Sequence, residues 1–249
     1  MSTPWVTVFL DLPVGSFDAA AAFWGQVTGY RPAPAADGGP AALLPRSGDA
    51  YLRLRRLSAG PGGCGLGLHV DTGAESLDAV AGRARAAGAR VDGTQAGGVT
   101  ARSPGGFPFS VTAWDGERAV PPPLAGDAGD GAGASRLDTL CLDVPPGLFD
   151  RELAFWTALT GQRTRPAPVP GYAYLAGPAS WPVRLLLQRR ERSGPGDPVR
   201  GHVDFGCTDP LAVGRHVALG ARVAATQQYW TVLDDPAGRE YCLVGRDPR

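Results

Sequence analysis

The sequence predicts an α+β protein of two tandem domains, each containing two βαβββ units, so that the whole chain has four. Two observations carry this prediction: most of the chain is duplicated, and strand-forming and helix-forming segments follow one another in the same order in each copy. A third observation is a tract rich in proline and glycine that separates the copies. With 249 residues, of which 43% are hydrophobic, the chain is long enough for two small cores.

The duplication is the strongest signal in the sequence. Residues 8–34 read VFLDLPVGSFDAAAAFWGQVTGYRPAP, and residues 140–168 read LCLDVPPGLFDRELAFWTALTGQRTRPAP. Two later pairs of stretches also match, HVD at 69–71 with HVD at 202–204, and SPGGFPFSVT at 103–112 with DPAGREYCLV at 235–244. Repetition over this length predicts that the two halves of the chain fold alike.

The stretch between the copies has the composition of a linker. It contains three consecutive prolines followed by a tract of glycine, alanine and aspartate. Such a tract cannot bury enough apolar surface to offset the entropy of ordering it. We therefore predict an N-terminal domain over 4–116, a linker over 117–135 and a C-terminal domain over 136–247.

Periodicity places the elements within the C-terminal copy. Residues 137–144 alternate in polarity and are rich in β-formers, which predicts a strand. Residues 149–159 carry apolar side chains at helical spacing, and Gly161 ends this helix. The remaining predicted segments are strands at 172–175 and 183–188, a strand at 202–207, a helix over 210–219, and strands at 222–225, 231–233 and 240–244.

Several side chains receive a structural interpretation. The pairs Phe23/Trp24 and Phe155/Trp156 are expected to pack helices against a sheet, and His216 is expected at the surface. The glycine-rich residues 60–67 are interpreted as a loop. The cysteines Cys64, Cys141, Cys207 and Cys242 form no Cys-x-x-Cys pair, so a reducing compartment with buried thiols is expected.

Composition excludes several classes of protein. The 24 basic and 24 acidic residues leave no basic excess to neutralise phosphates, so nucleic acid is not an expected partner. No apolar run approaches the roughly 18–20 residues of a membrane span, and the N-terminus does not look like a signal peptide. We expect a soluble, cytoplasmic protein. The chain contains no lysine, which excludes Schiff-base chemistry and a P-loop.

The order of the motifs resembles the vicinal oxygen chelate superfamily. The motifs are Asp-x-Pro, a helix with Ala-Phe-Trp, Thr-Gly, a histidine opening the second unit, and Asp-Pro-x-Gly-x-Glu before the final strand. The nearest branch is that of glyoxalase-like proteins, related to glyoxalase I, bleomycin-resistance proteins and extradiol dioxygenases. The resemblance covers nearly all of the chain outside the linker. It implies a curled mixed sheet in each domain that forms a cup.

In the metalloenzymes of this superfamily, side chains inside the cup hold a divalent metal, which requires three or more ligands. The resemblance implies that His202 and Glu240 match two ligand positions of the C-terminal domain. Thr139 stands where a further ligand is expected and is not a metal ligand. The N-terminal domain keeps His69, but Pro108 stands at the position of Glu240. We therefore expect no cofactor, with a divalent metal in the C-terminal domain as the alternative.

Three interpretations of His202 and Glu240 stay open. They can form a buried hydrogen-bonded pair that closes the cup, hold a metal with a further ligand, or act as an acid/base pair without a metal. Asp71 and Asp204 lie two residues beyond each histidine and therefore on the same strand face. They are expected to orient the histidines, to line the cup or to face solvent.

The leading functional hypothesis is a glyoxalase-like protein that binds a small organic molecule in a cup-shaped cavity without a complete metal site. The alternative is a metal-dependent lyase, isomerase or dioxygenase acting through His202 and Glu240; glyoxalase I activity itself is not expected. A third hypothesis is a fused scaffold, either a monomeric pseudo-dimer or a homodimer. The candidate ligand-binding residues are Thr139, Tyr172, Tyr174, Trp181, Trp230 and Tyr241 in the C-terminal domain, and His69, Tyr51 and Phe109 in the N-terminal domain.

Overall fold

The structure is a computed structural model whose strands form two mixed sheets. It describes residues 3–34, 39–60, 62–95, 97–126, 133–167, 169–191, 193–194 and 196–249, without the side chains of 94–95. The strand orders are β2-β3-β4-β1-β5-β8-β7-β6 in one sheet and β11-β12-β13-β10-β14-β17-β16-β15 in the other, with β9 paired to β10. The same order recurs in both copies, which confirms the predicted α+β class with βαβββ units.

The N-terminal copy contains two βαβββ units. Helix α1 ends at Gly29, which adopts the left-handed conformation (φ 71°) that favours glycine. Helix α2 begins after Ser76, whose side chain accepts a hydrogen bond from the backbone N–H of Ala79. The elements are β1 (Trp5–Pro13), α1 (Phe17–Thr28), β2 (Arg31–Ala33), β3 (Ala41–Leu44), β4 (Leu52–Leu57), β5 (Gly63–Val70), α2 (Leu77–Ala86), β6 (Arg90–Gln95), β7 (Gly98–Arg102) and β8 (Pro108–Ala113).

The C-terminal copy repeats this order. Its first helix ends at Gly161, as predicted, with φ 69°. Short 3₁₀ turns at Val14–Ser16 and Pro146–Leu148 precede the first helix of each copy. The elements are β10 (Ala134–Val144), α3 (Phe149–Thr160), β11 (Thr164–Pro166), β12 (Tyr172–Leu175), β13 (Arg184–Arg189), β14 (Arg200–Cys207), α4 (Ala212–Ala218), β15 (Arg222–Thr226), β16 (Trp230–Asp234) and β17 (Glu240–Gly245).

The packing of the chain divides it differently from the duplication. Two compact units form, and each takes segments from both copies. Unit 1 comprises Met1–Val8, Cys64–Arg118 and Leu140–Gly201, and unit 2 comprises Phe9–Gly63, Ala119–Thr139 and His202–Arg249. The cores of unit 1 and unit 2 therefore each combine one βαβββ motif of the N-terminal copy with one βαβββ motif of the C-terminal copy.

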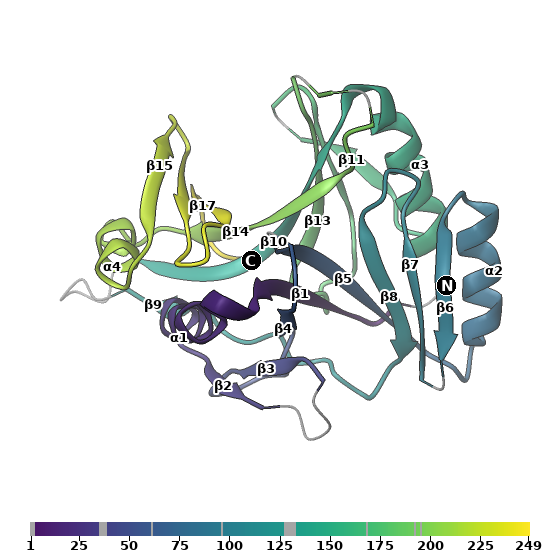
Figure 1. Cartoon of the computed structure of the whole chain (residues 1–249), viewed down its shortest axis with the longest axis horizontal. Coiled ribbons are helices and arrows are strands. Elements are labelled where there is room, and N and C mark those ends of the chain that lie inside the picture. Colours follow the sequence, from purple (N-terminus) through teal and green to yellow (C-terminus); the bar gives the residue numbers. More distant parts are fainter. Residues whose placement is uncertain are drawn as a thin grey trace. The chain divides into compact units, whose positions relative to one another are not determined.

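Unit 1 contains helices α2 and α3, which lie side by side (Figure 1). Its core is aromatic. Phe155 and Trp156 of α3 meet edge to face at 4.9 Å between ring centroids, and both rings contact Phe109 of β8. Phe107 also packs against Trp156, at 6.1 Å. The predicted packing role of Phe155 and Trp156 is confirmed, since each is at most 1% exposed.

Unit 2 contains helices α1 and α4, seen in Figure 1 as the purple and the yellow-green helix. Trp24 of α1 stacks on Phe205 of β14 at 6.3 Å between centroids and meets Tyr241 of β17 at 5.3 Å. Phe23 contacts the rings of Tyr241 and His216. In each unit the first helix of one copy, α1 or α3, therefore packs its aromatic pair on a sheet, as the sequence predicts.

In unit 1, a buried carboxylate fixes the helix tryptophan to the turn before the last strand of the N-terminal copy. Glu152, which is 0% exposed, accepts hydrogen bonds from Trp156 Nε1 at 2.9 Å, Ser103 Oγ at 2.8 Å and Gly105 N at 2.5 Å. A Cβ at Gly105 would meet Val199 Cγ2 at 2.5 Å, so only glycine allows this approach. Burial raises the pKa of Glu152, and these hydrogen bonds oppose the rise.

In unit 2, the corresponding carboxylate comes from the turn itself. Asp235 accepts a hydrogen bond from Trp24 Nε1 at 2.8 Å through Oδ2, and from the backbone N–H groups of Ala237 and Arg239 through Oδ1. Both units therefore satisfy a buried indole N–H and a tight turn with one carboxylate.

Two predictions from the sequence are wrong. Residues 63–67, interpreted as loop, belong to strand β5, because Cys64, Leu66 and Leu68 alternate along it and are buried while glycines occupy the other face. His216 is 0% exposed rather than at the surface, because it lies one turn from Ala212 on the face of α4 that packs on Phe205.

The predicted linker is partly built into unit 2. Arg136 donates a hydrogen bond to the carbonyl of Pro121, the backbone N–H of Ala119 donates to Asp49, and β9 (Leu124–Ala125) pairs with β10. Residues 127–132 lie outside the described residues. Sequence composition did not indicate these contacts because they involve mainly backbone groups.

We predict a pH-dependent stability that depends on His216. Its Nδ1 lies 2.9 Å from the hydroxyl of Tyr241. Burial lowers the pKa of His216 to about 4; the positive charge of Arg215 adds to this effect, and the negative charge of Asp209 opposes it. A lowered pKa means that the unfolded chain binds the proton more tightly, so this stability is present above pH ~6.5 and is lost as the pH falls towards 4.

The measurement is urea unfolding of the wild type and of His216→Gln at pH 6.5 and pH 5. The wild type should lose about 2 kcal/mol more than the variant over this interval. Other titrating groups cancel in the difference between the two proteins. Equal losses in both would show that His216 is not buried in its neutral form.

Candidate functional site

Strands β14 and β17 of unit 2 divide their side chains between two faces. The strands are parallel, with Val203 opposite Tyr241 and Asp204 opposite Cys242. Phe205 and Tyr241 lie on the face that packs against α1 and α4. Alternation places His202, Asp204 and Cys242 on the other face, which is turned away from these helices.

These three side chains form a compact cluster. His202 Nε2 lies 3.3 Å from Asp204 Oδ1, and Asp204 is 6% exposed. One ligand atom from each of His202, Asp204 and Cys242 falls within 4.8 Å of the others. Oδ1 of Asp204 is buried and makes no hydrogen bond among the described residues. Because Oδ1 is the atom that faces the His202 ring, the buried carboxylate and the imidazole form one polar pair on this face.

The sequence predicts Glu240 as the acid that accompanies His202. Glu240 begins β17 on the same face as Cys242, is exposed, and lies opposite Asp234 of β16. The acid at ion-pair distance from His202 is Asp204. The sequence also places Asp204 on this strand face. For Cys242 it predicts only a buried thiol, because the parallel register that sets Cys242 opposite Asp204 cannot be read from the sequence.

An apolar wall continues this face. Val232 of β16 pairs with Cys242 and Trp230 pairs with Val244, so both project on the side of the cluster. Trp230 and Val232 are half-buried. This face therefore combines a few polar groups with an aromatic and aliphatic surface, the composition of many small-molecule sites.

The N-terminal counterpart of His202 has different partners. In unit 1, His69 Nε2 lies 2.8 Å from Thr7 Oγ1, and its Nδ1 lies 3.9 Å from Glu117 Oε1. In unit 2, Thr139, the counterpart of Thr7, is 1% exposed and accepts a hydrogen bond from Arg246 at 3.0 Å. The duplicated histidines thus keep their strand position but lie in different polar surroundings.

The predicted aromatic residues fall into two groups. The side chains of Tyr51, Phe109, Trp181 and Tyr241 are at most 4% exposed and take part in core packing. The hydroxyl of Tyr51 donates to the carbonyl of Leu137 at 2.6 Å, and Trp181 Nε1 donates to the carbonyl of Thr3 at 2.7 Å.

The other group is more accessible. Tyr172 and Tyr174 of β12 are half-buried, while Ala173 and Leu175 on the opposite face are buried. Tyr172 pairs with Gln188 of β13, so the tyrosines form part of a half-buried face within unit 1. Together with Trp230 in unit 2, they are the predicted aromatic residues with surface available to a ligand.

Paired βαβββ units are the fold that the resemblance to the vicinal oxygen chelate superfamily implies. A family model described as "Glyoxalase-like domain" matches residues 7–112 and again residues 139–244. The chain therefore belongs to the glyoxalase-like domain family, with two copies of the domain in tandem. No curated protein sequence matches this chain significantly.

Solved structures share the fold at low sequence identity. The Mn(II)-bound glyoxalase from Novosphingobium aromaticivorans is 20% identical, with a TM-score of 0.67 over 95% of this chain and 80% of its own. The 2,2′,3-trihydroxybiphenyl 1,2-dioxygenase from Sphingomonas wittichii strain RW1 is 16% identical, with a TM-score of 0.65 over 98% and 90%. A catechol 2,3-dioxygenase is 14% identical, with a TM-score of 0.61 over 99% and 89%.

Among the described residues, none of the helices is both long and apolar enough to cross a membrane.

Proposed function

We propose that this protein binds a small organic molecule on the face of unit 2 that carries His202, Asp204 and Cys242. The observation that carries this proposal is the buried Asp204 carboxylate, whose Oδ1 lies 3.3 Å from the His202 imidazole on the same face as Trp230 and Val232. Polar groups held in this way on a sheet face, beside apolar side chains, can fix the orientation of a ligand.

The chemistry of this face indicates the ligand class. Trp230 and Val232 offer an apolar surface for a ring, and the pair of His202 and Asp204 places polar groups beside it for the oxygen atoms of a ligand. Two proteins of similar fold are a dioxygenase named for trihydroxybiphenyl and one named for catechol. An aromatic compound with neighbouring oxygens therefore fits both the residues and the fold.

A second candidate function, metal-dependent catalysis, is favoured by the same cluster. Imidazole, carboxylate and thiol are a donor set suited to a divalent transition metal, and their ligand atoms already lie within 4.8 Å of one another. His202, Asp204 and Cys242 would hold the ion. When bound, the metal would supply Lewis-acid polarisation of substrate oxygens.

In this second candidate the protein would be a lyase, an isomerase or a dioxygenase. Glu240 lies two residues before Cys242 on the same strand face and offers a further carboxylate. The sequence predicts it as the acid that accompanies His202. The ligand set differs from the four positions implied by resemblance to glyoxalase I, so that particular activity is not proposed.

Metal analysis separates the two candidates. If the second holds, protein purified without an affinity tag should carry about one transition-metal ion per chain, and His202→Ala and Cys242→Ser should lose it. His69→Ala is the matched control, because it removes the equivalent histidine of the other copy. Absence of metal in the wild type, even after incubation with manganese, iron, zinc or nickel, would contradict the second candidate.

Ligand binding is tested by thermal shift with catechol and biphenyl-2,3-diol. The wild type should gain at least about 2 °C in Tm at saturating ligand, and His202→Ala and Trp230→Ala should lose this gain while His69→Ala keeps it. The absence of a shift with either compound, or equal shifts in all variants, would contradict binding of an aromatic diol at this face.

A further inference from the structure

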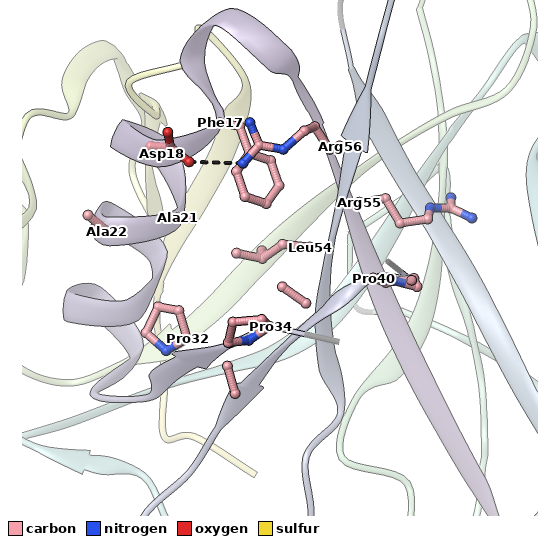
Figure 2. Close-up of a pocket in the computed structure, with 13 residues that line it drawn as sticks. Phe17, Asp18, Ala21, Ala22, Pro32, Pro34, Pro40, Leu54, Arg55 and Arg56 are labelled. Atoms are coloured by element: carbon pink, nitrogen blue, oxygen red, sulfur yellow. Dashed lines mark hydrogen bonds and ion pairs between the residues drawn. The ribbon is translucent and has the colours of Figure 1, made fainter. Parts of the chain in front are cut away.

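A cavity lies in unit 2, between helix α1 and strands β2–β4 (Figure 2). Its volume is about 810 Å³, within the range of sites for drug-sized molecules. Most of its lining is apolar, with Phe17 and Ala21 from α1, Leu54 from β4, and the ring of Pro32 from β2. The His202 cluster lies on a sheet face turned away from α1, so the two sites are separate.

Arg55 and Arg56 of β4 line this cavity, and the guanidinium of Arg56 is the one that faces helix α1. Arg56 lies over the ring of Phe17 at 3.9 Å and donates to Asp18 at 3.0 Å. Arg55 projects to the other side of the strand (Figure 2), where its guanidinium binds both oxygens of Asp11. Stacking on Phe17 holds Arg56 in place without neutralising its charge.

The ion pair of Arg56 is easily exchanged. The side chain of Asp18 is 89% exposed and that of Arg56 is 47% exposed, so their attraction is weakened by water. An anionic group that approaches from the cavity can take a bidentate position on the guanidinium without leaving Asp18 buried. The charged end of a ligand would therefore be an anion.

The duplication offers an internal comparison. In the C-terminal copy, Arg189 lies over Phe149 at 4.5 Å and pairs with Asp150 at 3.3 Å, which repeats the arrangement of Arg56, Phe17 and Asp18. The position of Ala21 is occupied there by Leu153. The equivalent helix of the C-terminal copy, with the equivalent arginine, thus accommodates a leucine at this position. The alanine of the N-terminal copy leaves room beside Phe17.

We propose that this cavity is a second binding site, which takes an amphipathic organic anion with an aromatic or aliphatic body and a carboxylate or sulfonate end. The body packs among Phe17, Ala21 and Leu54, and the anionic end binds Arg56. This site requires neither the His202 cluster nor a metal ion.

The test uses 8-anilinonaphthalene-1-sulfonate, a fluorescent aromatic anion, titrated into the full-length protein. The wild type should bind it with a defined number of sites. Ala21→Leu should remove one site by filling the cavity, and Arg56→Gln should weaken binding there by about tenfold or more, because a charged hydrogen bond is lost.

Two matched controls accompany these variants. Ala19→Leu adds the same side chain to an exposed position of α1 that does not line the cavity, and Arg189→Gln removes the corresponding arginine of the other copy. Both should keep the wild-type number of sites and affinity, and circular dichroism verifies that every variant is folded. The proposal is overturned if the wild type does not bind the probe, or if Ala21→Leu and Arg56→Gln bind it as the wild type does.

Discussion

The bond between a helix tryptophan and a buried carboxylate is the contact on which each compact unit depends. In unit 2, Trp24 donates to Asp235, and in unit 1, Trp156 donates to Glu152. Each carboxylate also binds the backbone of the turn that precedes a last strand. A buried indole N–H, a buried carboxylate and the backbone N–H groups of a tight turn would each destabilise the fold without a hydrogen-bond partner, and here they bind one another. The contact fixes a helix of one copy to a turn of the other.

The two units reach this arrangement with different residues. Asp235 of the C-terminal copy corresponds to Ser103 of the N-terminal copy, which has no carboxylate, and Glu152 corresponds to Ala20. The loss of the acid at the turn of unit 1 is thus offset by a glutamate on the helix that packs there. With the helix held on one face of the sheet, the opposite face is left to carry polar side chains, as His202 and Asp204 do in unit 2.

The repeated units, the order of their elements and the packing role of Trp24 and Trp156 could be predicted from the sequence, because duplication and periodicity are local patterns. That Glu152 supplies the carboxylate which the turn at Ser103 lacks could not be predicted, since it depends on which segments of the two copies pack together. The burial of His216 could not be predicted, because a short helix with a basic residue next to the histidine has the pattern of a surface helix. The position of Cys242 beside His202 could not be predicted either, because strand register decides which side chains meet.

The claim that Glu152 takes the role in unit 1 that Asp235 has in unit 2 is tested most directly by a double-mutant cycle. The free energy of unfolding in urea is measured for Glu152→Ala, for Ser103→Asp and for the double variant. Glu152→Ala should destabilise the protein by about 3 kcal/mol, because it leaves buried donors unsatisfied. Adding Ser103→Asp recreates the arrangement of Asp235 in unit 1 and should recover at least about 2 kcal/mol, whereas Ser103→Asp alone should be destabilising beside Glu152. Additive effects of the two substitutions would contradict the account.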